Sequence, residues 1–243
     1  MKPIAVQLYT LRTLEIPFPD LLEQVKNAGY TGVELRGTEG LKATELKAVL
    51  KDKDLKVTSA HVPIEVLEHA LDYVVPYHQE LGNDTIVVPW LAENERDWNK
   101  LADRLNAIYD HLKPHGMNLV YHNHDFEMEK VGDKTALDVV MENTNSEIGF
   151  ELDTAWIEVG GQDPLDFIKR YSGRVPRLHV KDVREDKDVE GGLADVGAGI
   201  LEWSRLLPAA QDAGVEWFIV EHDFPTDPLQ SIKRSAEFLN EHL

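Results

Sequence analysis

Eight short apolar runs recur along the chain at intervals of about 30 residues, with longer amphipathic stretches between them. The runs are rich in β-branched and aromatic residues and are bounded by turn residues, which is typical of strands. They cover Ile4–Tyr9, Val33–Arg36, Lys56–His61, Thr85–Trp90, Asn118–His124, Ile148–Asp153, Val175–Lys181 and Glu216–Glu221. Alternation of strand and helix implies parallel strands with right-handed crossovers. Eight such units predict one closed α/β barrel over residues 1–243, with an open doubly wound sheet as the alternative.

The stretches between the runs have helical spacing and helix-end signals. Phe18–Ala28 and Trp98–Leu112 each place their apolar residues on one face. Asp163 and Pro164 are expected at the N-cap and first position of another helix. Four glycines are expected to end helices in the left-handed conformation, namely Gly29, Gly82, Gly116 and Gly214. The longest irregular piece, Asp182–Gly199, is a candidate active-site loop.

Charge and cysteine content exclude several classes of protein. Lysine and arginine total 25 and aspartate and glutamate total 44, which gives a formal net charge of −19. Such a surface repels phosphate backbones, so nucleic acid is not expected as a partner. No apolar stretch reaches the roughly 18 residues that a membrane span needs. The lack of cysteine excludes disulfides and thiolate chemistry, and with a start that has no signal-peptide shape it predicts a cytoplasmic protein. Whether the protein is a homo-oligomer is left open.

Four of the runs end in side chains of the kinds that bind metals. Asp153, His179 and Glu221 end three runs, and His122 shares a face with His124 in a fourth. The carboxyl ends of parallel barrel strands meet on one rim, so these residues can surround one ion or substrate. A histidine at a strand end is, taken alone, more often only hydrogen-bonded. Four ligand types at successive strand ends favour a metal site, and this mixture suits Mn²⁺, Fe²⁺, Co²⁺ or Zn²⁺ better than Mg²⁺.

A set of short motifs, in this order and spacing, resembles the xylose-isomerase-like TIM-barrel superfamily, in its sugar phosphate isomerase/epimerase branch. The motifs are Gln7–Arg12, Gly32–Leu35, Tyr121–Glu127, Glu151–Thr154, Leu178–Asp182, Val196–Gly199 and Glu221–Asp223. The resemblance covers essentially the whole chain. It implies a single (β/α)8 TIM barrel, a small-molecule sugar substrate and a divalent metal, often Mn²⁺. In that superfamily the ion lies between a glutamate, an aspartate, a histidine and a glutamate of strands five to eight.

The chain departs from the pattern of that superfamily at two positions. Asp153, His179 and Glu221 match the last three ligands, but His122 stands where the epimerases usually have glutamate. The superfamily also often has histidine three residues after the strand-six aspartate, and here that residue is Trp156. The two-glutamate proton shuttle of the epimerases therefore cannot be carried over intact. Either His122 is a metal ligand and a candidate base, or metal binding has weakened.

The chemistry expected at this rim is proton transfer on a carbon beside a carbonyl. It needs a base near that carbon and an electrophile on the oxygen, which a divalent metal supplies. Glu221 and His122 are the candidate bases, and Glu221 is favoured because a metal-bound neutral imidazole is a poor base. Lys181 shares the inward face of His179 and is expected to bind a substrate oxygen or negative group. The alternative for Lys181 is an ion pair with Asp182 or Glu221.

The other half of the rim is expected to bind the sugar. Tyr9, Glu34 and His61 end the first three runs and offer hydroxyl-binding groups. Trp90 and Trp156 are expected to stack on a sugar face, with packing of the core or rim as the alternative. A supporting acidic residue, Glu127, follows strand five in a position to orient a metal-bound histidine.

One structural prediction concerns buried charge below the rim. Glu151 and Arg177 each precede a proposed ligand by two residues, so both are expected to point into the barrel one layer down. Because an unpaired buried charge is costly, we expect the two side chains to pair directly or through water.

Three classes of function remain. The leading one is a metal-dependent isomerase or epimerase of a sugar, keto-sugar or keto-inositol that works through an enediolate. The second is a lyase or dehydratase, which keeps the proton abstraction but expels a β-hydroxyl or glycosyl group. The third is a sugar-binding barrel without turnover. The endonuclease IV relatives share the barrel but use more metal ligands, and the negative charge argues against DNA repair.

Overall fold

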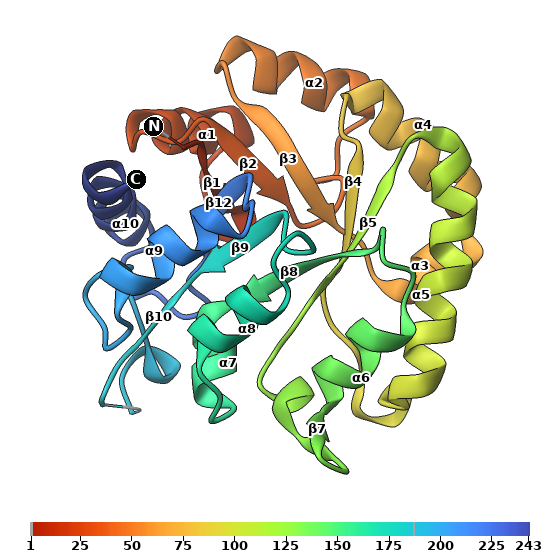
Figure 1. Cartoon of the computed structure of the whole chain (residues 1–243). Coiled ribbons are helices and arrows are strands. Elements are labelled where there is room, and N and C mark those ends of the chain that lie inside the picture. Colours follow the sequence, from red (N-terminus) through yellow and green to blue (C-terminus); the bar gives the residue numbers. More distant parts are fainter. Residues whose placement is uncertain (1, 187) are drawn as a thin grey trace.

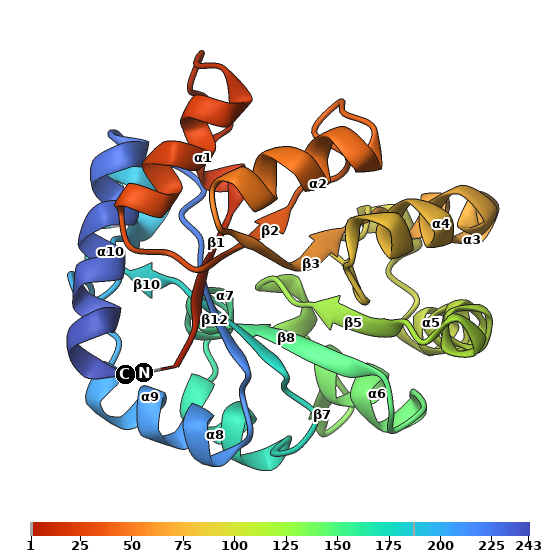
Figure 2. The same ribbon diagram turned by 90° about the horizontal axis from the view of Figure 1, so that it is seen from above.

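Eight parallel strands close into a barrel, with β12 pairing with β1 to complete it (Figures 1 and 2). The computed structural model describes residues 2–186 and 188–243. The barrel strands are β1 (Ile4–Gln7), β2 (Gly32–Leu35), β3 (Lys56–His61), β4 (Thr85–Val88), β5 (Asn118–His122), β8 (Gly149–Asp153), β9 (Arg177–Val180) and β12 (Trp217–Val220). The predicted closed barrel is therefore confirmed, and the open sheet is excluded.

Helices cover the outside of the barrel, as the view along it shows (Figure 2). They are α1 (Phe18–Asn27), α2 (Ala43–Asp52), α3 (Ile64–His69), α4 (Leu71–Leu81), α5 (Trp98–Leu112), α6 (Ala136–Asn143), α7 (Thr154–Val159), α8 (Pro164–Arg170), α9 (Trp203–Asp212) and α10 (Pro228–His242). The last helix lies beside the start of the chain in both views, and the Tyr30 hydroxyl donates to the Ile232 carbonyl at 2.7 Å. This contact ties the end of the chain to its beginning.

Element boundaries follow the local signals in the sequence closely. Asp163 caps α8 by accepting from the Leu165 amide, with Pro164 at the first helical position, as predicted. The four helix-ending glycines all have φ between 69° and 99°. Six strands end one or two residues earlier than predicted, because the chain leaves the hydrogen-bonded ladder before the apolar pattern stops. Tyr9, for example, lies in a 3₁₀ turn, Leu8–Leu11, after β1.

The loop after β9 is more ordered than its sequence indicates. It contains the hairpin of β10 (Asp182–Val183) and β11 (Leu193–Ala194). The buried carboxylate of Asp182 holds the loop together by accepting from four backbone amides and the Trp203 indole. A second small hairpin, β6 (Lys130–Val131) with β7 (Lys134–Thr135), precedes α6.

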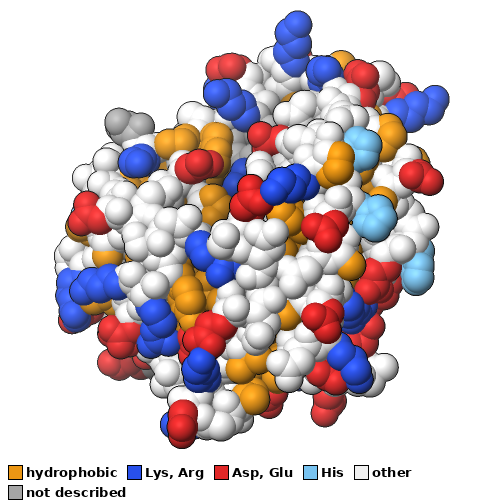
Figure 3. Space-filling model, turned by 45° about the vertical axis from the view of Figure 1, so that its right-hand side comes forward, with side chains coloured by type: hydrophobic (Ala, Val, Ile, Leu, Met, Phe, Trp, Pro, Cys, Tyr) orange, Lys and Arg blue, Asp and Glu red, His pale blue; other side chains and the backbone are white. Residues whose placement is uncertain are grey.

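Residues alternate between the barrel interior and the helical shell. Outward residues such as Val33, Leu152 and Leu178 are fully buried under helices, which stabilises the layers by the hydrophobic effect. Inward residues are largely polar, including Glu34 and Glu151, and they form the floor of the site. The outer surface carries acidic and basic side chains interspersed with small apolar groups (Figure 3). Within the described residues, no helix is long and apolar enough to cross a membrane.

Candidate active site

Four side chains converge at the carboxyl ends of β5, β8, β9 and β12. His122, Asp153, His179 and Glu221 each offer a ligand atom, and these atoms all lie within 4.8 Å of one another. His179 Nδ1 is 3.3 Å from Glu221 Oε2 and 3.8 Å from Asp153 Oδ2. His122 Nε2 is 4.0 Å from Asp153 Oδ2. We call these four residues the rim cluster, and they are the set that the sequence predicted would converge.

The ammonium of Lys181 lies against the rim cluster and is fully buried. Its Nζ is 2.6 Å from Glu221, 2.7 Å from Asp223 and 3.0 Å from Asp153. Burial opposes the charge on Lys181, but these carboxylates outweigh it and hold the lysine pKa well above its usual value. Of the two partners considered from the sequence, Glu221 is therefore correct, whereas Asp182 is used by the loop.

The rim cluster has the features of a cation site. Asp153 Oδ2 and His179 Nδ1 are buried and form no hydrogen bond in residues 2–186 and 188–243, and their close contacts are the ion pairs with Lys181 at 3.0 Å and Glu221 at 3.3 Å. Three carboxylates share the Lys181 ammonium here. Burial opposes a charge on His179, but Glu151 and Glu34 hold its pKa well above the usual value, so this ring adds a second positive charge and one negative charge remains in excess. Burial raises the pKa of Asp153 to about 6, although Lys181 and His179 act in the opposite direction. A divalent cation would supply both the missing partners and the missing charge.

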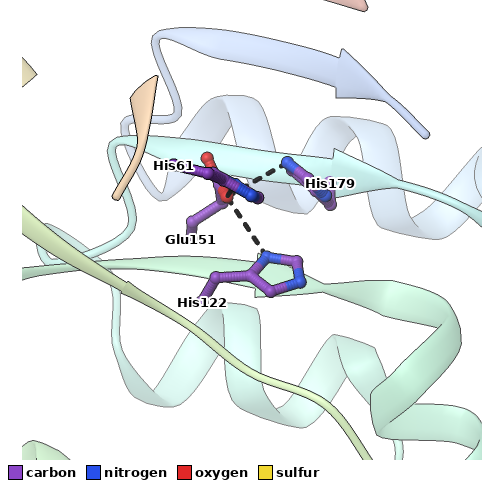
Figure 4. Close-up of side chains that lie close together, drawn as sticks. All are labelled: His61, His122, Glu151 and His179. Atoms are coloured by element: carbon purple, nitrogen blue, oxygen red, sulfur yellow. Dashed lines mark hydrogen bonds and ion pairs between the residues drawn. The ribbon is translucent and has the colours of Figure 1, made fainter. Parts of the chain in front are cut away.

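A second group of ligand-type side chains lies one layer deeper (Figure 4). Glu151 Oε2 is 3.1 Å from His61 Nε2, 3.1 Å from His122 Nδ1 and 3.0 Å from His179 Nε2. We call these four residues the deep cluster. His122 and His179 belong to both clusters and use a different ring nitrogen toward each.

Burial and charge are balanced within the deep cluster. Burial opposes ionisation of Glu151, but the histidines outweigh it and lower its pKa to about 2. Burial likewise opposes the charge on His61, yet Glu34 and Glu151 raise the pKa of His61 to about 10. Glu34 lies beneath the cavity and accepts from Gln7 and Ser59. The structure therefore places Glu34 against His61 and His179 rather than in the cavity.

The predicted pair of Glu151 and Arg177 does not form, and this prediction was wrong. The two residues are neighbours in the β8–β9 register. Arg177, however, donates to the Thr58 carbonyl and to the Thr85 hydroxyl, which lie across the barrel floor. Glu151 instead faces the three imidazoles above it. Each charge finds partners of its own, so adjacency in register does not decide the pairing.

A cavity of about 490 Å³ opens above the rim cluster. It is lined by Tyr9, Arg36, His61, Pro63, Pro89, Trp90, His122, His124, Trp156, Glu221, Asp223 and Phe224. The structure thus brings Tyr9, His61, Trp90 and Trp156 to the lining of one cavity. The sequence did not indicate Arg36, Asp223 or Phe224 as site residues. Arg36 was expected to end the second strand but follows it, and Asp223 and Phe224 lie in a loop whose course the pattern does not specify.

Two cavity residues have buried ring nitrogens that form no hydrogen bond in the described part of the chain. They are Trp156 Nε1 and His124 Nδ1. The two rings stack with their centres 5.6 Å apart. Burial lowers the pKa of His124 to about 3, so its ring is neutral near pH 7. Neutral ring nitrogens next to an indole N–H can hydrogen-bond the hydroxyls of a small polyol.

The predicted supporting residue Glu127 is fully buried behind β5. It accepts from the Tyr121 hydroxyl and from the His124 amide, the latter at 2.7 Å. Burial raises its pKa to about 7. Glu127 therefore fixes the backbone of the His124 turn, whereas the sequence led us to expect it against a histidine ring.

Comparison with known proteins places this architecture in a family. The family model described as xylose isomerase-like TIM barrel matches residues 22–242. This chain belongs to that family. The resemblance drawn from the sequence motifs is therefore confirmed.

The curated members of the family that resemble this chain include dehydratases. An inosose dehydratase from Lacticaseibacillus casei is 28% identical over 250 residues, which cover 85% of this chain and 82% of that protein. An inosose dehydratase from Geobacillus thermodenitrificans is 25% identical, and the match covers 93% and 90%.

Solved structures share the fold at lower identity. A sugar phosphate isomerase/epimerase from Parabacteroides distasonis has a TM-score of 0.83 and 24% identity, over 98% of this chain and 93% of that one. The protein described as the probable 3-DHS dehydratase of Bacillus anthracis has a TM-score of 0.77 and 16% identity over 99% of both chains. These similarities establish the barrel and do not identify a substrate.

Proposed function

We propose that this protein is a dehydratase that acts on a keto-inositol or keto-sugar by proton abstraction and β-elimination. The observation that carries the proposal is the pair of Glu221, which lines the cavity, and Lys181, whose ammonium lies 2.6 Å behind it. The ammonium keeps Glu221 ionised, and one carboxylate can take the proton from carbon and give it to the leaving hydroxyl, as elimination of water requires. The dehydratase names of the curated relatives support the same reaction class.

Each step can be assigned to residues of this chain. Burial opposes ionisation of Glu221, but Lys181 and His179 hold its pKa well below the usual value, so it is a carboxylate at neutral pH. Glu221 takes the proton from the carbon beside the ketone. The electron pair of that C–H bond forms a carbon–carbon double bond, and the β-hydroxyl leaves as water with the proton that Glu221 has taken up. Glu221 is thereby a carboxylate again, and Lys181, which does not line the cavity, holds it ionised from behind.

We also propose that the rim cluster binds the divalent metal of this reaction. Asp153, His179 and Glu221 would hold it with His122 as the fourth ligand, and the carboxylates favour Mn²⁺ with Co²⁺, Fe²⁺ or Zn²⁺ as alternatives. The bound ion would polarise the substrate carbonyl. His122 is the weakest part of this set, because its Nε2 lies 4.0 Å from Asp153.

The experiment is product analysis with a panel of keto-inositols and keto-sugars, in the presence of Mn²⁺ or Co²⁺. A dehydratase yields a product lighter by one water, whereas an isomerase conserves mass. Because Glu221 is also a proposed ligand, the Glu221→Gln variant is assayed at Mn²⁺ concentrations that fill the site, where turnover should still fall by about a thousandfold. Glu216→Gln, which changes an exposed glutamate before the same strand, should have no effect. Proton exchange in D₂O that survives in Glu221→Gln with metal bound would disprove the base assignment.

The isomerase or epimerase is the second candidate. His122 and Glu221 both line the cavity, so two groups are available for proton removal and return. Burial holds the pKa of His122 well below its usual value, which keeps it neutral and makes the pair unequal. A product of unchanged mass would favour this candidate. The absence of any turnover across the panel would instead support a sugar-binding barrel.

A further inference from the structure

The deep cluster offers a second set of metal ligands that the proposed reaction does not use. Three imidazole nitrogens and one carboxylate oxygen, from His61, His122, His179 and Glu151, lie within 4.8 Å of one another. Glu151 Oε1 is buried without a hydrogen-bond partner in the described part of the chain, and the buried His122 Nδ1 has only its contact with Glu151 Oε2 at 3.1 Å. Figure 4 shows the imidazoles gathered around the glutamate.

We propose that the deep cluster binds Zn²⁺ or a similar transition metal, and that this position and the rim cluster exclude one another. The proposal goes beyond the dehydratase activity and concerns metal selection. Imidazole-rich sites favour Zn²⁺ and Co²⁺, whereas carboxylate-rich sites favour Mn²⁺ and Mg²⁺. The deep cluster has three imidazoles and one carboxylate, and the rim cluster has two of each.

The spacing of the deep ligands suits a small ion. Glu151 Oε2 lies 3.0 to 3.1 Å from the three nitrogens. Four atoms at zinc bond lengths of about 2.1 Å stand roughly 3.4 Å apart at the corners of a tetrahedron. An outward movement of each side chain by a few tenths of an ångström would therefore admit the ion.

The surroundings of the deep cluster can compensate for that movement. Glu34 Oε2 lies 3.0 Å from His61 Nε2 and 2.7 Å from His179 Nε2, and it would give up both contacts to the ion. It keeps its bonds from Gln7 at 2.9 Å and Ser59 at 2.5 Å, so it is not left unsatisfied. Glu34 and Glu151 together carry two negative charges, which match one divalent cation. His61 and His122 line the cavity and provide a path of entry.

Mutual exclusion follows from the shared histidine. His179 faces the rim with Nδ1 and the deep cluster with Nε2. A neutral imidazole binds a metal through one nitrogen and carries a proton on the other. An ion on Nε2 therefore places a proton on Nδ1, which then donates to Glu221 and cannot bind a second ion.

The test is a pair of metal titrations on the full-length, metal-stripped protein, with Zn²⁺ and Mn²⁺ measured separately by calorimetry or chelator competition. His61 belongs only to the deep cluster and Asp153 only to the rim cluster. His61→Asn should lower the affinity for Zn²⁺ at least about tenfold and leave the affinity for Mn²⁺ within about twofold of the wild type. Asp153→Asn should lower the affinity for Mn²⁺ and leave that for Zn²⁺ nearly unchanged. His69→Asn, an exposed histidine on α3, should change neither. The visible spectrum of bound Co²⁺ should change in His61→Asn.

The outcomes separate this proposal from the proposed function. If His61→Asn leaves Zn²⁺ affinity unchanged, or if Asp153→Asn weakens both metals equally, the deep site is disproved. Two ions bound at once would disprove the exclusion. If Zn²⁺ binds as proposed but Mn²⁺ does not bind at all, the deep site stands and the metal-dependent function fails. Should His61→Asn lose cooperative thermal unfolding, Glu151→Gln replaces it, with the same expected loss of Zn²⁺.

Discussion

Two buried cations on the same side of β9 illustrate how the two ends of the barrel differ. Arg177 begins the strand at the floor and Lys181 follows its end at the rim. Arg177 donates to the Thr58 carbonyl at 2.6 and 3.2 Å and to the Thr85 hydroxyl at 3.0 Å, which are neutral acceptors. Lys181 is instead held by three carboxylates. The floor satisfies its cation with dipoles, whereas the rim surrounds its cation with excess negative charge.

This difference indicates that the charge of Arg177 has a structural role, whereas the charge of Lys181 belongs to the candidate site. At the floor, Arg177 donates to protein acceptors, so no ligand is needed to satisfy these hydrogen bonds. At the rim, Asp153 Oδ2 and His179 Nδ1 have ion-pair contacts but form no hydrogen bond among the described residues. Buried polar atoms without partners are costly and persist where a ligand completes them. Variants at the two ends should therefore respond differently to metal.

The largest effect on stability is expected from Lys181→Met. Without metal, the buried Asp153 and Glu221 and the partly exposed Asp223 lose their shared ammonium, which should cost about 3 kcal/mol of unfolding free energy. Mn²⁺ should restore most of that loss, because the ion takes over the charge that the lysine supplied. Thermal denaturation with chelator and with Mn²⁺ measures both values. Equal stabilisation of wild type and variant by Mn²⁺ would show that the ion does not bind these carboxylates.

Arg177→Met should cost less and should not respond to metal. The variant leaves the Thr58 carbonyl and Thr85 hydroxyl without their donor, for which we expect about 2 kcal/mol. Mn²⁺ affinity should equal that of the wild type, because no rim ligand contacts Arg177. Arg205→Met, which changes an exposed arginine, is the matched control. A change in Mn²⁺ affinity in Arg177→Met would mean that the floor and the rim are coupled.

The helical shell provides a third kind of buried titratable group. His78 is buried in α4 and accepts from the Asn83 amide at its Nδ1. Burial lowers its pKa to about 4, from an ordinary value of 6.5. The fold therefore favours the neutral ring. The free energy of unfolding has its full value for this group above pH 6.5 and falls as the pH falls toward 4.

The measurement is chemical denaturation of wild type and His78→Gln at pH 7 and pH 5. Between pH 7 and pH 5, the free energy of unfolding should fall by about 1 to 2 kcal/mol more in the wild type than in the variant. Only the wild type must bury a histidine that is charged in the unfolded chain. Parallel pH curves for the two proteins would refute the buried neutral state.

The sequence predicted eight alternating units because its strands are short, apolar and evenly spaced. That pattern favoured a closed barrel over an open sheet, and the pairing of β12 with β1 shows the closure. The sequence also predicted the rim cluster, since strand ends converge in any parallel barrel. It could not predict the deep cluster, because whether Glu151 meets Arg177 or the histidines depends on how far each side chain leans along its strand. Loop residues such as Asp223 and Phe224 were missed for a related reason: their positions depend on contacts that no local pattern encodes.

The smallest effect is expected at Trp156. A variant there tests whether the indole N–H, which has no hydrogen-bond partner in the described chain, donates to the substrate. Its amide donates to Asp153 at 3.0 Å, and its indole Nε1 is buried without a partner in the described chain. Trp156→Phe keeps the ring packing on His124 but removes the N–H. If a substrate hydroxyl accepts from Nε1, KM should rise about three- to tenfold, with kcat and Mn²⁺ affinity nearly unchanged. Trp156→His retains a ring N–H, so its KM should rise less than that of Trp156→Phe. An unchanged KM in Trp156→Phe would exclude this bond, and a fall in kcat alone would place Trp156 in the chemical step.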